Sequence, residues 1–238
     1  WPEKNGTVTN TNRQVQMGRK VINPPGESRE DLEIINDLGK ALGLDWNYNH
    51  ASEVFNEMSK VMPSLNNISW ERVDKEDSVT YPCDDKNLPG NEIVFSQNFP
   101  TSSGLAKIVP TDLISPHELP DQNFPFVLTT GRLLEHWHTG AMTRRSNTLD
   151  NIEPEAIVNM NRLDMKNLKL EPGNKVQVKT RRGSIELSVR QDTELPKGMI
   201  FIPFCFSEAA ANKLTNPQLD PFGKIPEFKY CAANIEAC

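Results

Sequence analysis

Two neighbouring segments of alternating hydrophobicity, residues 175–180 and 185–190, constrain the fold most strongly. Their apolar residues occupy every second position: Val176, Val178, Ile185, Leu187 and Val189. Successive side chains of a β-strand point to opposite faces, so this pattern is typical of two strands that each bury one face. The residues Arg-Arg-Gly-Ser at 181–184 separate the two segments and are typical of a turn. The sequence therefore predicts a β-hairpin.

The same half of the chain contains further short apolar runs that predict strands. These runs are residues 126–128, 155–160, 199–202 and 226–233. One short helix is predicted after residue 160, with Leu163 and Leu168 turned inward. Many short strands with a single short helix favour a small closed β-barrel over a doubly wound sheet.

The first half of the chain predicts helices. Leu32, Ile35, Leu38 and Leu42 recur at helical spacing over residues 29–42, after a Ser-Arg-Glu-Asp sequence that resembles a capping box. A second helix is predicted to follow, with an inner face formed by Val54, Phe55, Met58 and Val61.

The middle of the chain is predicted to connect two domains. Residues 93–95 and 105–109 predict two strands on the basis of their apolar character. A stretch punctuated by Pro110, Pro116, Pro120 and Pro125 follows them and is typical of a linker. We therefore place a domain boundary near residue 120, which divides the chain into residues 1–120 and 121–238.

Charge and cysteine content exclude several classes of function. The formal net charge of −6 argues against nonspecific binding to nucleic acid or to a membrane surface. The sequence contains no apolar run of about 18 residues, as a membrane span requires. Its 4 cysteines are scattered, so this chain alone is not expected to build a zinc or iron–sulfur site. Reduced cysteines in a cytoplasmic protein are the expectation.

A basic segment follows the predicted strand at 126–128. Residues 129–145 contain three arginines, two histidines, a tryptophan and four threonines, but only one acidic residue. Arginine holds phosphate oxygens bidentately, and Gly131 and Gly140 would let the backbone approach a ligand closely. The composition suits a large, planar, anionic cofactor. A polar loop whose arginines pair with surface acids explains it equally well, so both interpretations stay open at this point.

Two later residues are further candidates for ligand binding. The amide of Asn212 combines donors with an acceptor, as recognition of the edge of a heterocycle requires. A tight helical turn capped by Asn212 explains the same sequence. Lys229 could reach an anion, although a surface lysine is the commoner case.

Four stretches of the sequence resemble the catalytic subunits of formate dehydrogenases, which belong to the molybdopterin oxidoreductase superfamily. The longest is Phe-Pro-Phe-Val-Leu-Thr-Thr-Gly-Arg-Leu-Leu-Glu-His-Trp-His-Thr-Gly-Ala-Met-Thr-Arg-Arg at 124–145. The others are residues 6–16, 170–183 and 211–232. Because the matches follow one another in order along nearly the whole chain, the resemblance is specific. It identifies the chain as the C-terminal part of such a subunit.

The resemblance implies a mixed fold of α/β and β parts. A six-stranded double-psi β-barrel is expected over residues 121–238, and residues 1–120 are expected to be the tail of a preceding α/β domain plus a linker. The barrel would bind a bis(molybdopterin guanine dinucleotide) cofactor that carries molybdenum or tungsten. The residues that match the cofactor-binding motifs are Thr130, Gly131, Arg132, His136, Trp137, His138, Thr139, Asn212 and Lys229.

The resemblance also implies what this chain lacks. The metal-ligating Cys or selenocysteine, the neighbouring active-site His and the iron–sulfur cysteines of the family have no counterpart here. We therefore expect no catalytic and no metal-ligating residue in this chain, which alone should not oxidise formate. In the intact subunit the implied reaction is oxidation of formate to carbon dioxide. The implied partners are the remaining domains, with their iron–sulfur cluster, and electron-transfer subunits.

Three alternatives to this interpretation remain. The same domain could belong to another family member, such as a nitrate reductase. The barrel could instead be a non-catalytic module for protein interaction, which would have no use for the His-Trp-His sequence. A metal site at His136 and His138 is a weaker hypothesis, because no third ligand follows at a plausible spacing.

Overall fold

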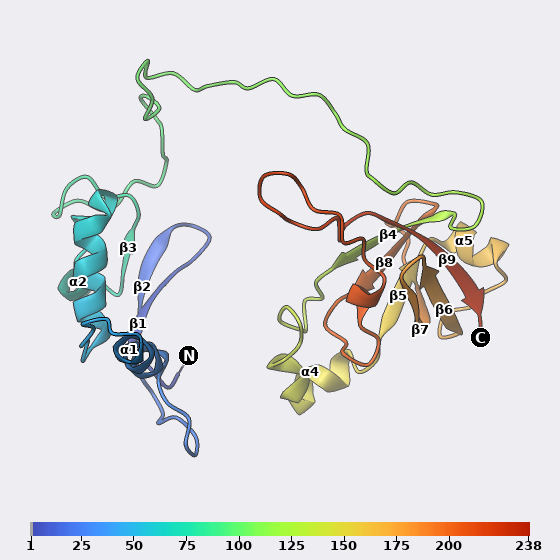
Figure 1. The fold of residues 1–238 in the computed structure, drawn as a ribbon, viewed down its shortest axis with the longest axis horizontal. Helices are drawn as coiled ribbons and strands as arrows, with labels where there is room; N and C mark the ends of the chain where they lie inside the picture. Colours follow the sequence, from blue (N-terminus) through green and yellow to red (C-terminus); the bar gives the residue numbers. More distant parts are fainter. Residues whose placement is uncertain (1) are drawn as a thin grey trace. The chain divides into compact units, whose positions relative to one another are not determined.

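The computed structural model describes residues 2–238 and divides into two compact units, Trp1–Pro110 and Thr111–Cys238 (Figure 1). The first unit contains a three-stranded antiparallel sheet with the order β1-β2-β3. Its strands are β1 (Gly6–Thr9), β2 (Gln14–Gly18) and β3 (Ser78–Thr80). Its helices are α1 (Asp31–Ala41), α2 (Ala51–Val61), the 3₁₀ helix η1 (Pro63–Leu65) and α3 (Trp70–Glu76).

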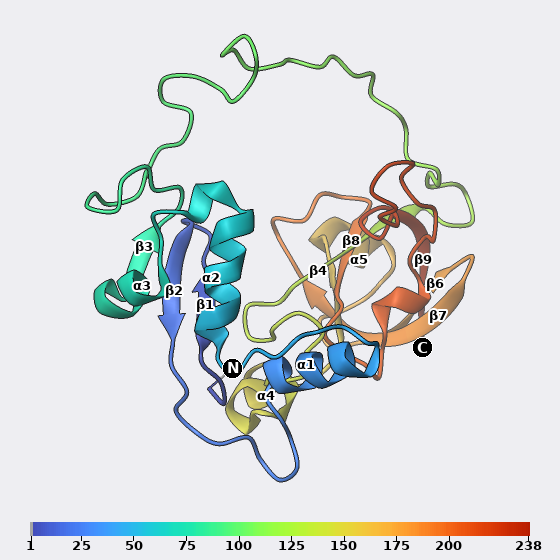
Figure 2. The same ribbon diagram turned by 60° about the vertical axis from the view of Figure 1, so that its left-hand side comes forward.

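A small apolar core joins the sheet of the first unit to its helices. The buried members of this core are Val15, Phe55, Leu65, Ile68, Val73, Val79 and Cys83. Phe55 comes from α2, which runs alongside the sheet in both Figure 1 and Figure 2. The sheet therefore buries one face against α2 and α3.

The predicted helices of the first unit are present, but their predicted apolar faces are largely wrong. Glu30 caps α1 without a side-chain hydrogen bond, so the predicted capping box is absent. Leu38 and Leu42 are 59% and 71% exposed, whereas Asn36 and Gly39 are buried. The reason is local, because α1 packs against the segment that follows it. A Cβ on Gly39 would lie 2.4 Å from the ring of Trp46.

The second helix shows the same deviation from its sequence pattern. Of its four predicted inner residues, Phe55 is buried, whereas Val61 is 77% exposed and Val54 and Met58 are also exposed. His50 caps α2 at its N-terminus, since its ring nitrogen Nδ1 accepts a hydrogen bond from the backbone N–H of Ser52. Helical spacing therefore located the helix, while the surrounding chain decided which side of it is covered.

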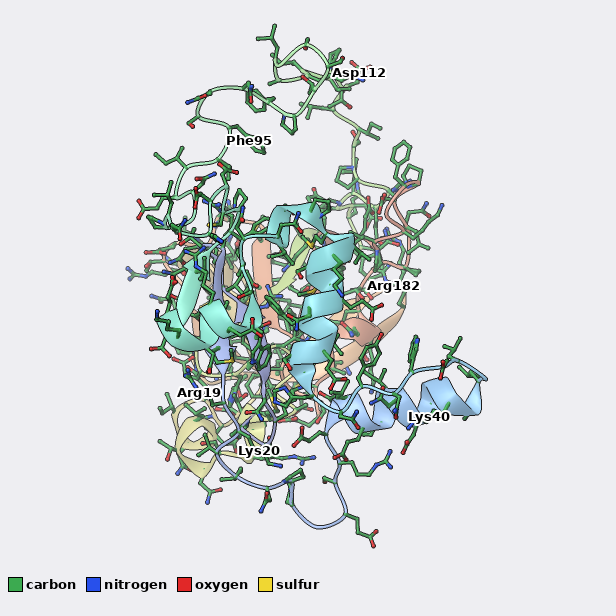
Figure 3. All side chains as sticks on the ribbon, turned by 90° about the vertical axis from the view of Figure 1, so that its left-hand side faces the viewer. Arg19, Lys20, Lys40, Phe95, Asp112 and Arg182 are labelled. Carbon is green, nitrogen blue, oxygen red and sulfur yellow. The ribbon has the colours of Figure 1, made fainter. Side chains whose placement is uncertain are left out.

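Residues 81–125, all described by the structure, contain no helix or strand (Figure 1). The strands predicted at 93–95 and 105–109 are therefore wrong, and Ile93 and Ile108 are 76% and 90% exposed. Figure 3 labels Phe95 and Asp112 on this irregular segment. A strand must pair its backbone N–H and C=O groups with a neighbouring strand, and these two runs have no such neighbour.

The second unit is a closed barrel with the strand order β4-β8-β5-β7-β6-β9. Its strands are β4 (Phe126–Gly131), β5 (Ile157–Met160), β6 (Lys175–Thr180), β7 (Gly183–Gln191), β8 (Met199–Pro203) and β9 (Cys231–Ala237). Two pairs are parallel, β4 with β8 and β5 with β7, and the other neighbours are antiparallel. The predicted six-stranded double-psi barrel and its β6–β7 hairpin are confirmed. Within residues 2–238, no helix is both long enough and apolar enough to cross a bilayer.

Alternating side chains of the strands fill the barrel. Val176 and Val178 are fully buried, as their alternation predicted, and Ile202 of β8 is fully buried as well. The helix predicted after residue 160 is α5 (Arg162–Asn167), but its inward residues were predicted wrongly. Leu163 is 57% exposed, and Met165 packs into the core instead. The last strand begins at Cys231, five residues later than predicted, because residues 227–230 form a turn-rich approach to it.

The strand directions place three connections, two of them long, at one end of the barrel, which we call the mouth end. These connections are residues 132–156 after β4, the turn 181–182 after β6, and residues 204–230 between β8 and β9. They contain η2 (Thr143–Arg145), α4 (Asn147–Ile152) and η3 (Ala211–Lys213). In Figure 1 α4 lies to the left of the strands, whereas α5 and the C-terminus lie to the right.

A strap formed by residues 117–124 binds to the barrel through ion pairs. The carboxylate of Glu118 accepts hydrogen bonds from Arg181, Arg182 and the backbone N–H of Ala232. The His117 ring lies 3.0 Å from the carboxylate of Glu227. The arginines of the hairpin turn, one of which is labelled in Figure 3, are therefore paired rather than solvated.

Candidate functional site

The mouth end carries most of the sequence-predicted site residues on one loop, residues 132–146, which we call the mouth loop. It begins where β4 ends at Gly131 and continues into α4. Its backbone bends at residues 137–140, where the N–H of Gly140 donates to the carbonyl of Trp137 at 2.9 Å. The N–H of Trp137 donates to the hydroxyl of Thr143 at 2.9 Å. These bonds give the loop a defined shape.

Two glycines of this region are required by packing within the chain. A Cβ on Gly131 would lie 2.4 Å from the ring of Phe201, a residue of the neighbouring strand β8. Gly140 has a φ of +74°, and a Cβ there would lie 2.6 Å from the carbonyl oxygen of Cys205. L-residues with side chains rarely adopt this left-handed conformation. The close approach that the sequence suggested for a ligand is made here to neighbouring parts of the barrel.

Three of the predicted site residues are buried. Besides Gly131, these are Thr130 and His136, which are 3% and 1% exposed. The hydroxyl of Thr130 donates to the carbonyl of Phe228 at 2.8 Å. The His136 Nε2 atom bonds the carbonyl of Glu153 at 2.8 Å, so Nε2 carries the proton. Among the described residues, the Nδ1 atom of His136 has no hydrogen-bond partner.

The remaining predicted residues of the mouth loop are exposed, and two of them share a support. The guanidinium of Arg132 lies 6.0 Å from the ring centroid of Phe204, and the His138 ring packs against the same ring at 5.2 Å. Trp137 and Thr139 flank His138 and are exposed as well. His138 has a φ of +50°, an uncommon conformation that turns the chain. The loop thereby exposes the Arg132 guanidinium, the Trp137 and His138 rings and the Thr139 hydroxyl together.

Asn212 and Lys229 belong to the β8–β9 connection, which leaves the barrel at the same end. Asn212 lies in η3 and is exposed, and no hydrogen bond of its side chain is present among the described residues. The Lys229 ammonium donates to the carbonyl of Thr130 at 2.5 Å. Because an ammonium carries three N–H groups, two donors of Lys229 remain for another partner.

The arginines at the mouth end differ in their electrostatic state. Arg144 is paired with Asp150 and Glu208, and Arg181 and Arg182 of the hairpin turn are paired with Glu118. In the part of the chain that the structure describes, Arg132 is in no ion pair and is exposed. Since a paired guanidinium offers little net charge to an anion, Arg132 is the better candidate for binding one.

The histidines do not build a metal site within residues 2–238. His136 is buried against Phe206, and His138 is exposed against Phe204. No group of three His, Cys, Asp or Glu side chains with the arrangement of a metal site occurs among the described residues. Cys83, Cys205 and Cys231 are buried free thiols, and Cys238 is an exposed one. Burial raises the pKa of the Cys205 thiol to about 11, so this thiol stays protonated near neutral pH.

Sequence reasoning missed the residues that support the loop. Phe204 carries Arg132 and His138, and Phe206 lies beneath His136 and Arg144. The available signal was that Phe204 and Phe206 lie two positions apart directly after β8, because alternate residues of an extended segment share a face.

Comparisons with known proteins agree with this arrangement. A family model described as Molydopterin dinucleotide binding domain matches residues 126–232, and one described as Molybdopterin oxidoreductase matches residues 1–41. The fold also resembles acetylene hydratase from Pelobacter acetylenicus, with a TM-score of 0.75 and 17% identity, over 100% of this chain and 37% of that chain. The chain belongs to the molybdopterin oxidoreductases, and its barrel is their dinucleotide-binding domain.

The most informative relatives are formate dehydrogenase subunits. The F420-dependent formate dehydrogenase subunit alpha of Methanocaldococcus jannaschii is 45% identical over 99% of this chain and 35% of the relative. A subunit alpha of Methanococcus maripaludis is 39% identical over the same shares. The assimilatory nitrate reductase catalytic subunit of Bacillus subtilis is 31% identical over 98% of this chain and 34% of the relative. The chain thus spans about a third of the length of these relatives.

Proposed function

We propose that this chain is the cofactor-binding portion of a formate dehydrogenase alpha subunit. Residues 121–238 would be the domain that binds the guanine dinucleotide of the molybdopterin cofactor, and residues 1–120 would belong to the α/β domain before it. The formate dehydrogenase relatives are more similar to this chain than the nitrate reductase, at 45% against 31% identity. A nitrate reductase remains the second candidate, because the nitrate reductase subunit matches this chain over the same region.

One observation carries the binding role. Arg132, which is exposed and in no ion pair within residues 2–238, and the ring of His138 lie on one supporting ring, Phe204, at the end of the barrel where Asn212 and Lys229 also emerge. These groups are cationic, aromatic and amide donors, which suit pyrophosphate oxygens and the edges of heterocycles. The donor set therefore fits a dinucleotide of the molybdopterin type.

Each of the predicted site residues would have its own role in binding the dinucleotide. Arg132 would hold a phosphate oxygen through its planar fork, and Asn212 would bond a heterocycle edge. Trp137, His138 and Thr139 would offer a ring face and polar donors beside them. Lys229, held by the carbonyl of Thr130, would present its remaining N–H groups to the ligand. Thr130, Gly131 and His136 would act from within the barrel by fixing the ends of this surface.

The cofactor, when bound, supplies the redox chemistry through its molybdenum or tungsten ion. The side chains of this portion bind and orient it, and we propose that the metal ligand and the iron–sulfur cluster come from the rest of the subunit. This portion alone would then be inactive toward formate. In the whole enzyme, electrons from formate would pass through electron-transfer subunits to F420, as the names of the relatives suggest, and we propose a cytoplasmic location.

Titration of the chain with guanosine diphosphate, followed by heteronuclear NMR, tests this proposal. We expect shifts confined to Arg132, residues 137–139, Asn212 and Lys229. Helix α5 serves as the internal control, because it lies at the opposite end of the barrel. No shift at millimolar ligand would contradict binding by this portion alone, and would favour a barrel that serves protein interaction.

A further inference from the structure

Arg144 has contacts that the binding role does not use. Its Nε group donates to Asp150, and its Nη1 group donates to Glu208 at 3.0 Å. Its guanidinium also lies 4.6 Å from the ring centroid of Phe206, within the range of cation–π attraction. Its side chain is 22% exposed. We propose that Arg144 is a positioning residue that holds the mouth loop in its binding shape and does not itself bind the anionic ligand.

Backbone contacts connect Arg144 to the exposed part of the loop. The N–H of Arg144 donates to the carbonyl of Gly140 at 2.9 Å, and the N–H of Gly140 donates to Trp137. A Cβ atom added to Gly140 would clash with both the Cγ atom of Arg144 and the carbonyl oxygen of Cys205. Displacement of Arg144 therefore moves the turn at residues 137–140, which presents Trp137, His138 and Thr139.

Charge separates this role from direct phosphate binding. Two carboxylates, Asp150 and Glu208, surround one guanidinium, so the cluster has a net charge of −1. Burial alone would lower the pKa of Arg144, but its hydrogen bonds to both acids raise it. An approaching phosphate would meet two negative charges beside donors that are already engaged.

His136 provides a second anchor for the same loop. Its ring packs edge-on against Phe206 at 5.8 Å, and its Nε2 group donates to the backbone carbonyl of Glu153. Arg144 also packs on Phe206 and bonds Asp150, so both anchors connect the loop to the segment around α4. The loop is held beneath its middle and near its end, while its tip stays exposed.

Removal of the acidic partners distinguishes a positioning residue from a ligand. We would compare Arg144→Gln with a Glu208→Gln single variant and an Asp150→Asn/Glu208→Gln double variant. Arg145→Gln is the matched control, since Arg145 is exposed and its side chain has no hydrogen bond or ion pair among the described residues. The readouts are amide hydrogen exchange over residues 137–145 and the dissociation constant for guanosine diphosphate. Exchange in the β6–β7 hairpin verifies that each variant is folded.

A positioning role predicts that Arg144→Gln and the double variant change in the same direction. Charge-assisted hydrogen bonds are worth enough that exchange in the loop should become roughly tenfold faster or more, with weaker nucleotide binding. Glu208→Gln should give a smaller change of the same sign. Arg145→Gln should leave the exchange rates unchanged.

Two results would overturn the positioning role. One is tighter or unchanged nucleotide binding by the double variant together with weaker binding by Arg144→Gln, as expected of a direct phosphate ligand freed from its acids. The other is unchanged loop exchange in a folded Arg144→Gln variant. The effect on the ligand rests on the function proposed above, whereas the anchoring of the loop does not. If the unaltered chain binds no nucleotide but the exchange results hold, the proposed function fails and the anchoring stands.

Discussion

The two units of the molecule bury their apolar residues to very different degrees. In the barrel, residues such as Leu128, Val176 and Ile202 are fully buried. In the first unit, Leu38 and Leu42 of α1 are more than half exposed, although their spacing is that of a buried helix face. The barrel completes its core from its own strands and the segments that connect them. The first unit has a core of only a few side chains and should be the less stable of the two.

The difference follows from how each unit buries a face. A closed sheet supplies both the backbone partners and the interior for its own side chains, since its strands pair in a ring. A helix such as α1 depends on whatever packs beside it, and only Asn36 and Gly39 are buried in it. Apolar periodicity in a strand of the barrel was therefore a better guide to burial than the same periodicity in α1 and α2.

Matched leucine substitutions would test this contrast most strongly. Leu128→Ala removes a fully buried side chain from β4 and should lower the free energy of unfolding by about 3–4 kcal/mol. Leu38→Ala is the control, because this leucine is 59% exposed and alanine favours helices, so a change within about 0.5 kcal/mol is expected. Urea unfolding of both variants measures the difference. Equal destabilisation would mean that α1 buries its leucines in solution.

The strap offers a second test, directed at the barrel. Burial by itself would raise the pKa of Glu118, but the hydrogen bonds and charge of Arg182 and Arg181 lower it below the ordinary value of 4.5. A lowered pKa means that this stabilisation is fully present above about pH 4.5 and is lost as the pH falls through the folded-state pKa. Glu118→Gln should cost about 2 kcal/mol at neutral pH.

The Glu118→Gln variant should also lose part of the acid dependence of barrel stability. Unfolding curves recorded between neutral and acidic pH measure the difference between the two chains. The difference should shrink at low pH, where Glu118 is protonated in the unaltered chain. A constant difference at all pH values would show that the charge of Glu118 is not what holds the strap.

A third test compares the two ends of the barrel. Arg132→Ala should weaken binding of guanosine diphosphate roughly tenfold, with little effect on thermal stability, because its guanidinium is exposed and in no ion pair among the described residues. Arg162→Ala removes an equally exposed arginine of α5 at the other end and should leave binding unchanged. In the whole subunit, Arg132→Ala should also reduce the molybdopterin content. Equal effects of the two variants would indicate nonspecific attraction of the anion.

Much of the barrel could be predicted from local patterns. The β6–β7 hairpin follows from alternation over two adjacent segments and from the turn between them, all within one short stretch. The false strands at 93–95 and 105–109 have similar apolar character, but strand formation depends on a partner elsewhere in the chain. The inward face of α5 was predicted wrongly for a related reason, since its neighbours decided that Met165 rather than Leu163 is buried.

The sequence by itself determined the kinds of groups at the mouth end and the strands that carry them, because composition and alternation are local properties. Only the tertiary structure divided those groups into buried and exposed sets. Thr130 and His136 bond the carbonyls of Phe228 and Glu153, residues far along the chain, while Arg132 and His138 share the ring of Phe204. The pairing of Arg144 with Glu208 depends on contacts that barrel closure creates, and no local pattern encodes it.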